Sequence, residues 1–102
     1  MSINIEKKYR QLDIEKVMAD ERFCQATCDI AEAVAIDERT RPLWPSCPLD
    51  QMYVMLNEWK EGMLAARDYK QGEISADMYR ARLALIAGVV ARAMMHIEGG
   101  EK

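Results

Sequence analysis

The sequence has few of the residues that interrupt helices. Its 102 residues include only three prolines and five glycines, and six of these eight lie at 42–48, at Gly72 or at 99–100. No stretch alternates apolar and polar residues as a strand does, whereas alanine, methionine, glutamate and arginine all favour helix. These absences exclude a β-rich fold. We therefore predict an all-α bundle of three or four helices, forming one domain over residues 1–102.

Cysteine, long apolar runs and net positive charge are also scarce. The three cysteines are odd in number and do not suit a disulfide framework. The apolar stretch at 83–90 is far shorter than the roughly 20 residues that cross a bilayer, and the N-terminus lacks an apolar signal segment. The net charge of −3 argues against a nucleic-acid partner. We expect a cytoplasmic protein that binds neither membrane nor nucleic acid.

The spacing of apolar residues predicts where the helices lie. Residues from about 4 to 37 are expected to form one long helix or two broken ones, with a break near Asp20, because the apolar phase drifts there. Prolines exclude helix across the loop at 39–48. A second helix is expected at about 49–70 and a third at about 75–98, since apolar residues recur there every three or four positions.

Single residues mark the expected helix ends. Pro48 suits the first position of the second helix, where a missing N–H costs nothing. Gly72 is expected to stop this helix in the left-handed conformation, and Ser75 is a good N-cap for the next. His96 lies near the end of that helix, where the helix dipole favours a cation, so we expect it to cap the helix. With the three cysteines it also makes a conceivable zinc set, although short-spaced cysteine pairs are absent.

The third helix is apolar on two sides, although one apolar side would be enough to pack the helix within a monomer. Its bulky stripe consists of Tyr79, Leu83, Ile86, Val90, Met94 and Ile97. A second stripe of small residues contains Gly88, and glycine inside a helix costs roughly 0.5–1 kcal/mol. Gly88 therefore indicates the close approach of another backbone, either from a partner or from the same chain. We expect a homodimer whose second and third helices share a core, with these interface residues: Ala84, Ala87, Gly88, Ala91, Met94 and Trp44.

Three short motifs, in order, resemble one helical family. They are Asp20-Glu21-Arg22-Phe23-Cys24-Gln25, Leu43-Trp44-Pro45 and Met55-Leu56-Asn57-Glu58-Trp59-Lys60-Glu61-Gly62, and they are followed by a helix at 78–97. This order is similar to that of the MazG-like all-α nucleoside triphosphate pyrophosphohydrolases of phages and bacteria. The resemblance covers about residues 19–98. It implies a Mg²⁺ ion that carboxylates from two helices hold over the phosphates, where an activated water attacks.

The residues that would hold this metal depart from the family pattern. Glu58 and Glu61 match two glutamates of the family's first metal-binding motif, but Asn57 stands where the motif has its first glutamate. In the second motif, Arg82 stands where the family has a ligand. An arginine beside two carboxylates repels Mg²⁺ and satisfies the acids in its place. We therefore predict that Arg82 pairs with Glu58 or Glu61; the alternative is a displaced Mg²⁺ site of Glu58, Glu61 and Asp77.

These departures favour a binding protein over an enzyme. We expect no catalytic residue and no cofactor, but a non-catalytic helical protein-interaction module on a degenerate MazG-like scaffold. A phage-type inhibitor of a host enzyme or defence complex fits this description, although the residues do not identify the protein partner. Its binding patch is expected to contain exposed methionines or Trp44 in the proline loop. Under the alternative, the chain is a Mg²⁺-dependent nucleoside triphosphate pyrophosphohydrolase with Glu58 and Glu61 as ligands.

Overall fold

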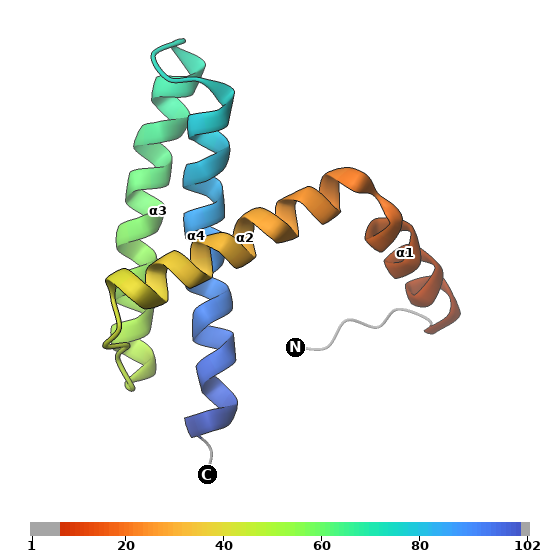
Figure 1. Cartoon of the computed structure of the whole chain (residues 1–102), viewed down its shortest axis with the longest axis horizontal. Helices are drawn as coiled ribbons and strands as arrows, with labels where there is room; N and C mark the ends of the chain where they lie inside the picture. Colours follow the sequence, from red (N-terminus) through yellow and green to blue (C-terminus); the bar gives the residue numbers. More distant parts are fainter. Residues whose placement is uncertain (1–6, 101–102) are drawn as a thin grey trace.

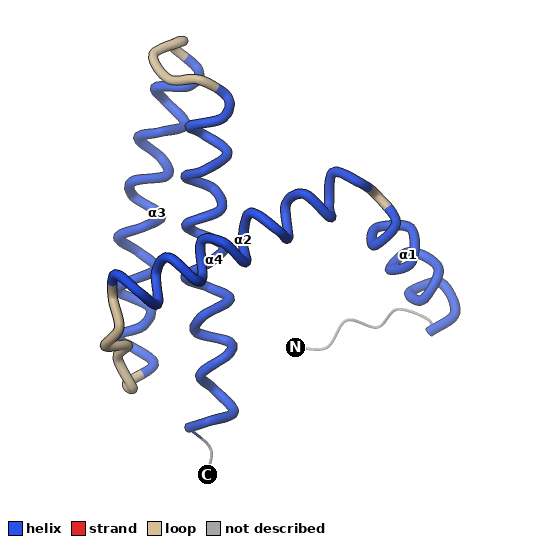
Figure 2. Tube along the Cα trace, viewed as in Figure 1, coloured by secondary structure: helices blue, strands red, loops and turns tan. Residues whose placement is uncertain are grey.

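The computed structural model of the chain describes residues 7–100, which form four helices joined by short connections (Figures 1 and 2). Helix α1 spans Lys7–Ala19, α2 spans Glu21–Thr40, α3 spans Pro48–Lys70 and α4 spans Ala76–Gly100. Strands are absent from this part of the chain, so the prediction of an all-α fold is confirmed. The expected helix start near residue 4 lies outside the described residues.

The break between α1 and α2 lies at Asp20, where the drifting apolar phase predicted it. The backbone there is extended, and the Asp20 carboxylate accepts a hydrogen bond from the backbone N–H of Arg22 at 2.8 Å. The Arg22 side chain also donates to this carboxylate at 2.6 Å. This N-cap satisfies a backbone N–H that the first turn of α2 leaves unpaired, and so it fixes the turn between the two helices.

Proline, glycine and serine define the ends of α3 and the start of α4. Pro48 is the first residue of α3, and Gly72 follows α3 with a φ of 77°. Ser75 caps α4, because its Oγ accepts a hydrogen bond from the backbone N–H of Met78 at 3.1 Å. Helix α4 continues to Gly100, so the expected capping role of His96 is wrong: His96 lies before the last turn.

Helices α3 and α4 form an antiparallel hairpin, and α2 crosses α4 on one face of this hairpin (Figure 1). Gly88 lies at the crossing, where an added Cβ would be 3.1 Å from the Cβ of Ala33. Only a residue without a side chain permits this approach without displacing α2. The backbone that approaches Gly88 is thus α2 of the same chain, which is the second of the two alternatives considered from the sequence.

The chain buries little apolar surface by itself. In the described part, the buried apolar side chains are those of Ala33, Val89 and Ala93. The accessible surface is 8344 Å², whereas a compact chain of this mass exposes about 5,900 Å². The radius of gyration is 16.0 Å, compared with about 13 Å for a compact chain of this length. Helix α1, which contacts α2 and no other described helix, extends away from the hairpin with the first half of α2 (Figure 1).

Candidate functional site

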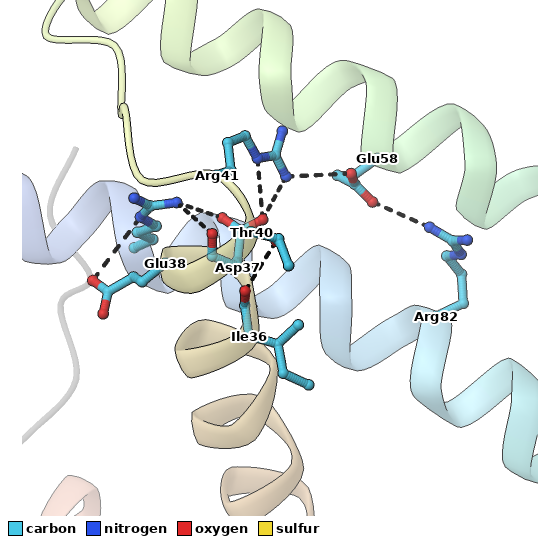
Figure 3. Close-up of polar contacts among 8 residues, drawn as sticks. Ile36, Asp37, Glu38, Thr40, Arg41, Glu58 and Arg82 are labelled. Atoms are coloured by element: carbon cyan, nitrogen blue, oxygen red, sulfur yellow. Dashed lines mark hydrogen bonds and ion pairs between the residues drawn. The ribbon is translucent and has the colours of Figure 1, made fainter.

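An alternating series of charged side chains connects α2, α3 and α4 beside the helix crossing (Figure 3). We call this series the ion-pair chain; its members, in spatial order, are Arg92, Asp37, Arg41, Glu58 and Arg82. The resemblance to the MazG-like family places the metal at Glu58. The ion-pair chain is therefore the candidate functional site, and its geometry decides what Glu58 can bind.

The buried end of the ion-pair chain is the pair between Asp37 on α2 and Arg92 on α4. Arg92 Nη1 donates to Asp37 Oδ2 at 2.8 Å and to the Asp37 carbonyl oxygen at 3.2 Å. The Asp37 side chain is 8% exposed and the Arg92 side chain is 3% exposed. Arg41 Nη2 donates to Asp37 Oδ1 at 2.7 Å. Burial raises the pKa of Asp37, but the hydrogen bonds from Arg41 and Arg92 outweigh this effect and hold the pKa below its usual 3.8.

The other end of the ion-pair chain is the pair between Glu58 on α3 and Arg82 on α4, and Glu58 lies between the guanidinium groups of Arg82 and Arg41 (Figure 3). Arg82 Nη1 lies 3.2 Å from Glu58 Oε1, and Arg41 Nη2 lies 3.6 Å from Glu58 Oε2. The ion pair predicted for Arg82 is present, and its carboxylate partner is Glu58. Sequence reasoning did not find the second cation, Arg41, which joins Glu58 to the buried pair.

The carboxylates proposed as an alternative Mg²⁺ site are not gathered in one place. Both oxygens of Glu58 face arginines, and the Asp77 side chain is 91% exposed and paired with Arg80 at 2.8 Å. Asp77 precedes Arg82 by five residues, which separates them by about 7.5 Å along the helix axis. Across the described residues, no group of three or more His, Cys, Asp or Glu side chains could hold a metal ion. These residues do not fit Mg²⁺, which needs several unpaired oxygen ligands.

Trp44 packs against α4, so the expectation that it forms an exposed binding patch is wrong. Its ring stacks on that of His96, with centroids 5.9 Å apart, and the Arg92 guanidinium carbon lies 4.7 Å from the Trp44 ring centroid. These contacts cover the buried end of the ion-pair chain with an aromatic ring. The three cysteines are free and exposed, and no group of three or more His, Cys, Asp or Glu among the described residues could hold a metal ion, so the conceivable zinc set is not assembled.

The remaining predicted interface residues lie on two different sides of α4. Ala84 and Ala87 line a hollow between α4 and the first half of α2, and Gly88 and Ala91 are buried and half-buried. The close approach that this small stripe permits is therefore made by α2. Met94 is different, because it is exposed and lines an apolar hollow between α3 and α4.

Two sequence signals point to the residues that were missed. Asp37 and Arg41 are four residues apart, a spacing at which opposite charges pair on a helix. Arg92 follows Gly88 by four residues, so it continues the small stripe that faces α2. Opposite charges directed at one helix crossing indicate a buried ion pair. The contact between Arg41 and Glu58 has no comparable signal, because it depends on the path of the 41–47 loop.

Comparisons of the chain with models of protein families, with curated proteins and with solved structures find no match. Membership of the MazG-like family therefore remains a prediction based on the motifs of the sequence. Among residues 7–100, no helix is both long enough and apolar enough to cross a membrane.

Proposed function

We propose that this protein is a non-catalytic protein-interaction module on a MazG-like scaffold, in which arginines take the place of the metal. The observation that carries the proposal is the position of Glu58 between Arg82 and Arg41. A guanidinium group keeps its charge at every physiological pH, so two of them beside one carboxylate both satisfy it and repel a divalent cation. A chain built in this way supplies a scaffold without the ligands for phosphate chemistry.

A binding role is supported by the apolar surface that the chain leaves exposed. Large apolar side chains are exposed on all four helices, and many of them are methionines, which adapt to the shape of a partner. We propose that one partner is a second copy of the chain and that the dimer then inhibits a host enzyme or defence complex, in the manner of a small phage protein. The three free cysteines fit action in the reducing cytoplasm.

The proposal is tested by measuring pyrophosphate release from mixed nucleoside triphosphates with Mg²⁺ and with Mn²⁺. The wild-type protein is compared with Glu58→Gln, which removes the carboxylate that the family would use, and with Arg80→Gln as an exposed control. We expect no release above background from any of the three folded proteins. Release by the wild type and by Arg80→Gln, but not by Glu58→Gln, would refute the proposal and identify an enzyme.

A further inference from the structure

The face of the α3–α4 hairpin opposite α2 carries two uncharged stripes. On α3 the stripe consists of Met52, Leu56, Trp59 and Met63, which recur at alternating spacings of four and three residues. Each of these side chains is more than half exposed. A 4-3 spacing of apolar residues is typical of a helix that packs along another helix, with knobs fitting into holes. The stripe on α3 therefore has the pattern of an interface, but none of the four described helices covers it.

Helix α4 carries a second stripe of Leu83, Val90, Met94 and Ile97. Successive residues of a helix are rotated by about 100°, so Val90 and Ile97 point about 200° and 180° away from Gly88. Because Gly88 faces α2, this stripe points to the opposite side of the hairpin. Helix α2 crosses the alanine and glycine side of α4 at Gly88, whereas the four bulky residues of the stripe are exposed.

The two stripes form one continuous face, because side chains from both line the same hollows. Trp59, Met63 and Leu83 share one apolar hollow, and Met52 and Met94 share a second of about 630 Å³ near the other end of the hairpin. We call this surface the hairpin face. It runs along both helices, and none of the eight residues of its stripes is charged.

The exposed area is large enough to include an interface on the hairpin face. The chain exposes 8344 Å², roughly 2,400 Å² more than a compact chain of its mass, while a standard interface takes about 800 Å² from each partner. Among the described residues, three buried apolar side chains make a small core, so burial of the hairpin face would add substantially to the stability of the fold. A partner that is present whenever the chain folds would supply the missing burial. A second copy, made from the same message, meets this requirement.

We infer that the hairpin face binds the hairpin face of a second copy, so that two hairpins form a four-helix bundle. The interface is isologous: the stripes of each chain pack on those of the other around a two-fold axis. Helix α2 stays on the outer side of each hairpin, and the arm of α1 and the first half of α2 projects from the dimer. This inference rests on the homodimer within the proposed function and assigns its surface.

Methionine oxidation tests the inference on the unmodified protein. Met63 and Met94 lie on the hairpin face, whereas Met18 on α1 and Met95 on the α2 side of α4 lie off it. All four are 58–64% exposed within one chain, so they differ mainly in the proposed burial by a partner. The protein is treated with dilute hydrogen peroxide, and oxidation of each methionine is followed by mass spectrometry. Its mass in solution is measured by light scattering at the same concentration.

We expect a mass of twice 11.7 kDa and oxidation of Met63 and Met94 on the order of tenfold slower than that of Met18 and Met95. A dimer in which all four react at similar rates would overturn the assigned face and leave the homodimer standing. A monomer with similar rates would overturn both. As a second arm, we expect Met63→Glu to lower the dimer affinity at least about 100-fold, and the matched variant Met18→Glu to leave it unchanged. The opposite ranking would contradict the inference.

Discussion

Removing the charge of Asp37 is expected to destabilise the fold more than removing that of Arg92. In Asp37→Asn, the Arg92 guanidinium stays 3% exposed and keeps only neutral acceptors at hydrogen-bond distance. Burying a charge without its partner costs about 3–5 kcal/mol. The nearest other carboxylate to Arg92 Nε is that of Glu38, at 4.0 Å, and it is too exposed to replace Asp37. This loss is a large fraction of the stability of a small domain.

The reverse change leaves a paired charge. In Arg92→Met, Asp37 keeps its bonds to Arg41 at 2.7 and 3.1 Å, so the carboxylate remains neutralised. The expected cost is the loss of charged hydrogen bonds, about 1.5–3 kcal/mol. The methionine also retains contact with the Trp44 ring through its sulfur. We therefore expect Asp37→Asn to be the more destabilising of the two by at least about 1 kcal/mol.

Urea unfolding followed by circular dichroism measures both free energies of unfolding. All samples need the same protomer concentration, because the stability of the proposed dimer depends on it. Arg80→Gln, whose exposed pair with Asp77 contributes little, serves as the control. Arg92 would not be a buried charge that depends on Asp37 if Asp37→Asn lowered the free energy of unfolding by less than about 1 kcal/mol. The same conclusion would follow if Asp37→Asn lowered it by less than Arg92→Met does.

Three further predictions concern the same helices. The pKa of Asp37 in the folded state lies below its usual 3.8. The ionised carboxylate therefore stabilises the fold fully above pH 3.8, and this stabilisation is lost as the pH falls through the folded-state pKa. The urea midpoint of unfolding should fall more between about pH 5 and pH 2 for the wild type than for Asp37→Asn. Gly72→Ala should cost about 1 kcal/mol in a thermal melt, since φ is 77° and no neighbouring atom lies within 4 Å of the added Cβ. Gly88→Leu should lower the free energy of unfolding in urea by at least about 1 kcal/mol, because the leucine side chain would collide with Ala33. An unchanged free energy of unfolding would mean that α2 does not cross α4 at Gly88.

Local signals in the sequence predicted most of the helix boundaries. Pro48, Gly72 and Ser75 act through backbone geometry and capping within a few residues, and each lies where its chemistry placed it. The break at Asp20 was similarly local, since a drifting apolar phase means that one straight helix cannot bury its residues. His96 failed as a helix cap because α4 continues to Gly100.

The packing of the helices depends on contacts between distant residues, which periodicity does not show. Two apolar sides of α4 were evident, but only the crossing of Ala33 over Gly88 shows that α2 occupies the small side. The resemblance to the MazG-like family predicted that Arg82 pairs with Glu58 or Glu61, and Glu58 is the partner. Arg41 was missed because its position beside Glu58 is set by the loop between α2 and α3. Trp44 was misplaced for the same reason, since the loop carries it onto α4.

We propose that Arg82 and Arg41 occupy the place at Glu58 that a metal takes in the MazG-like family. Calorimetric titration of Mg²⁺ and then Mn²⁺ into the wild-type protein and Glu58→Gln tests it most directly, because it needs no substrate. We expect no saturable heat of binding for either protein. Saturable binding to the wild type that Glu58→Gln abolishes would contradict the proposal, since it would mean that the cation displaces Arg82 and Arg41 from the carboxylate.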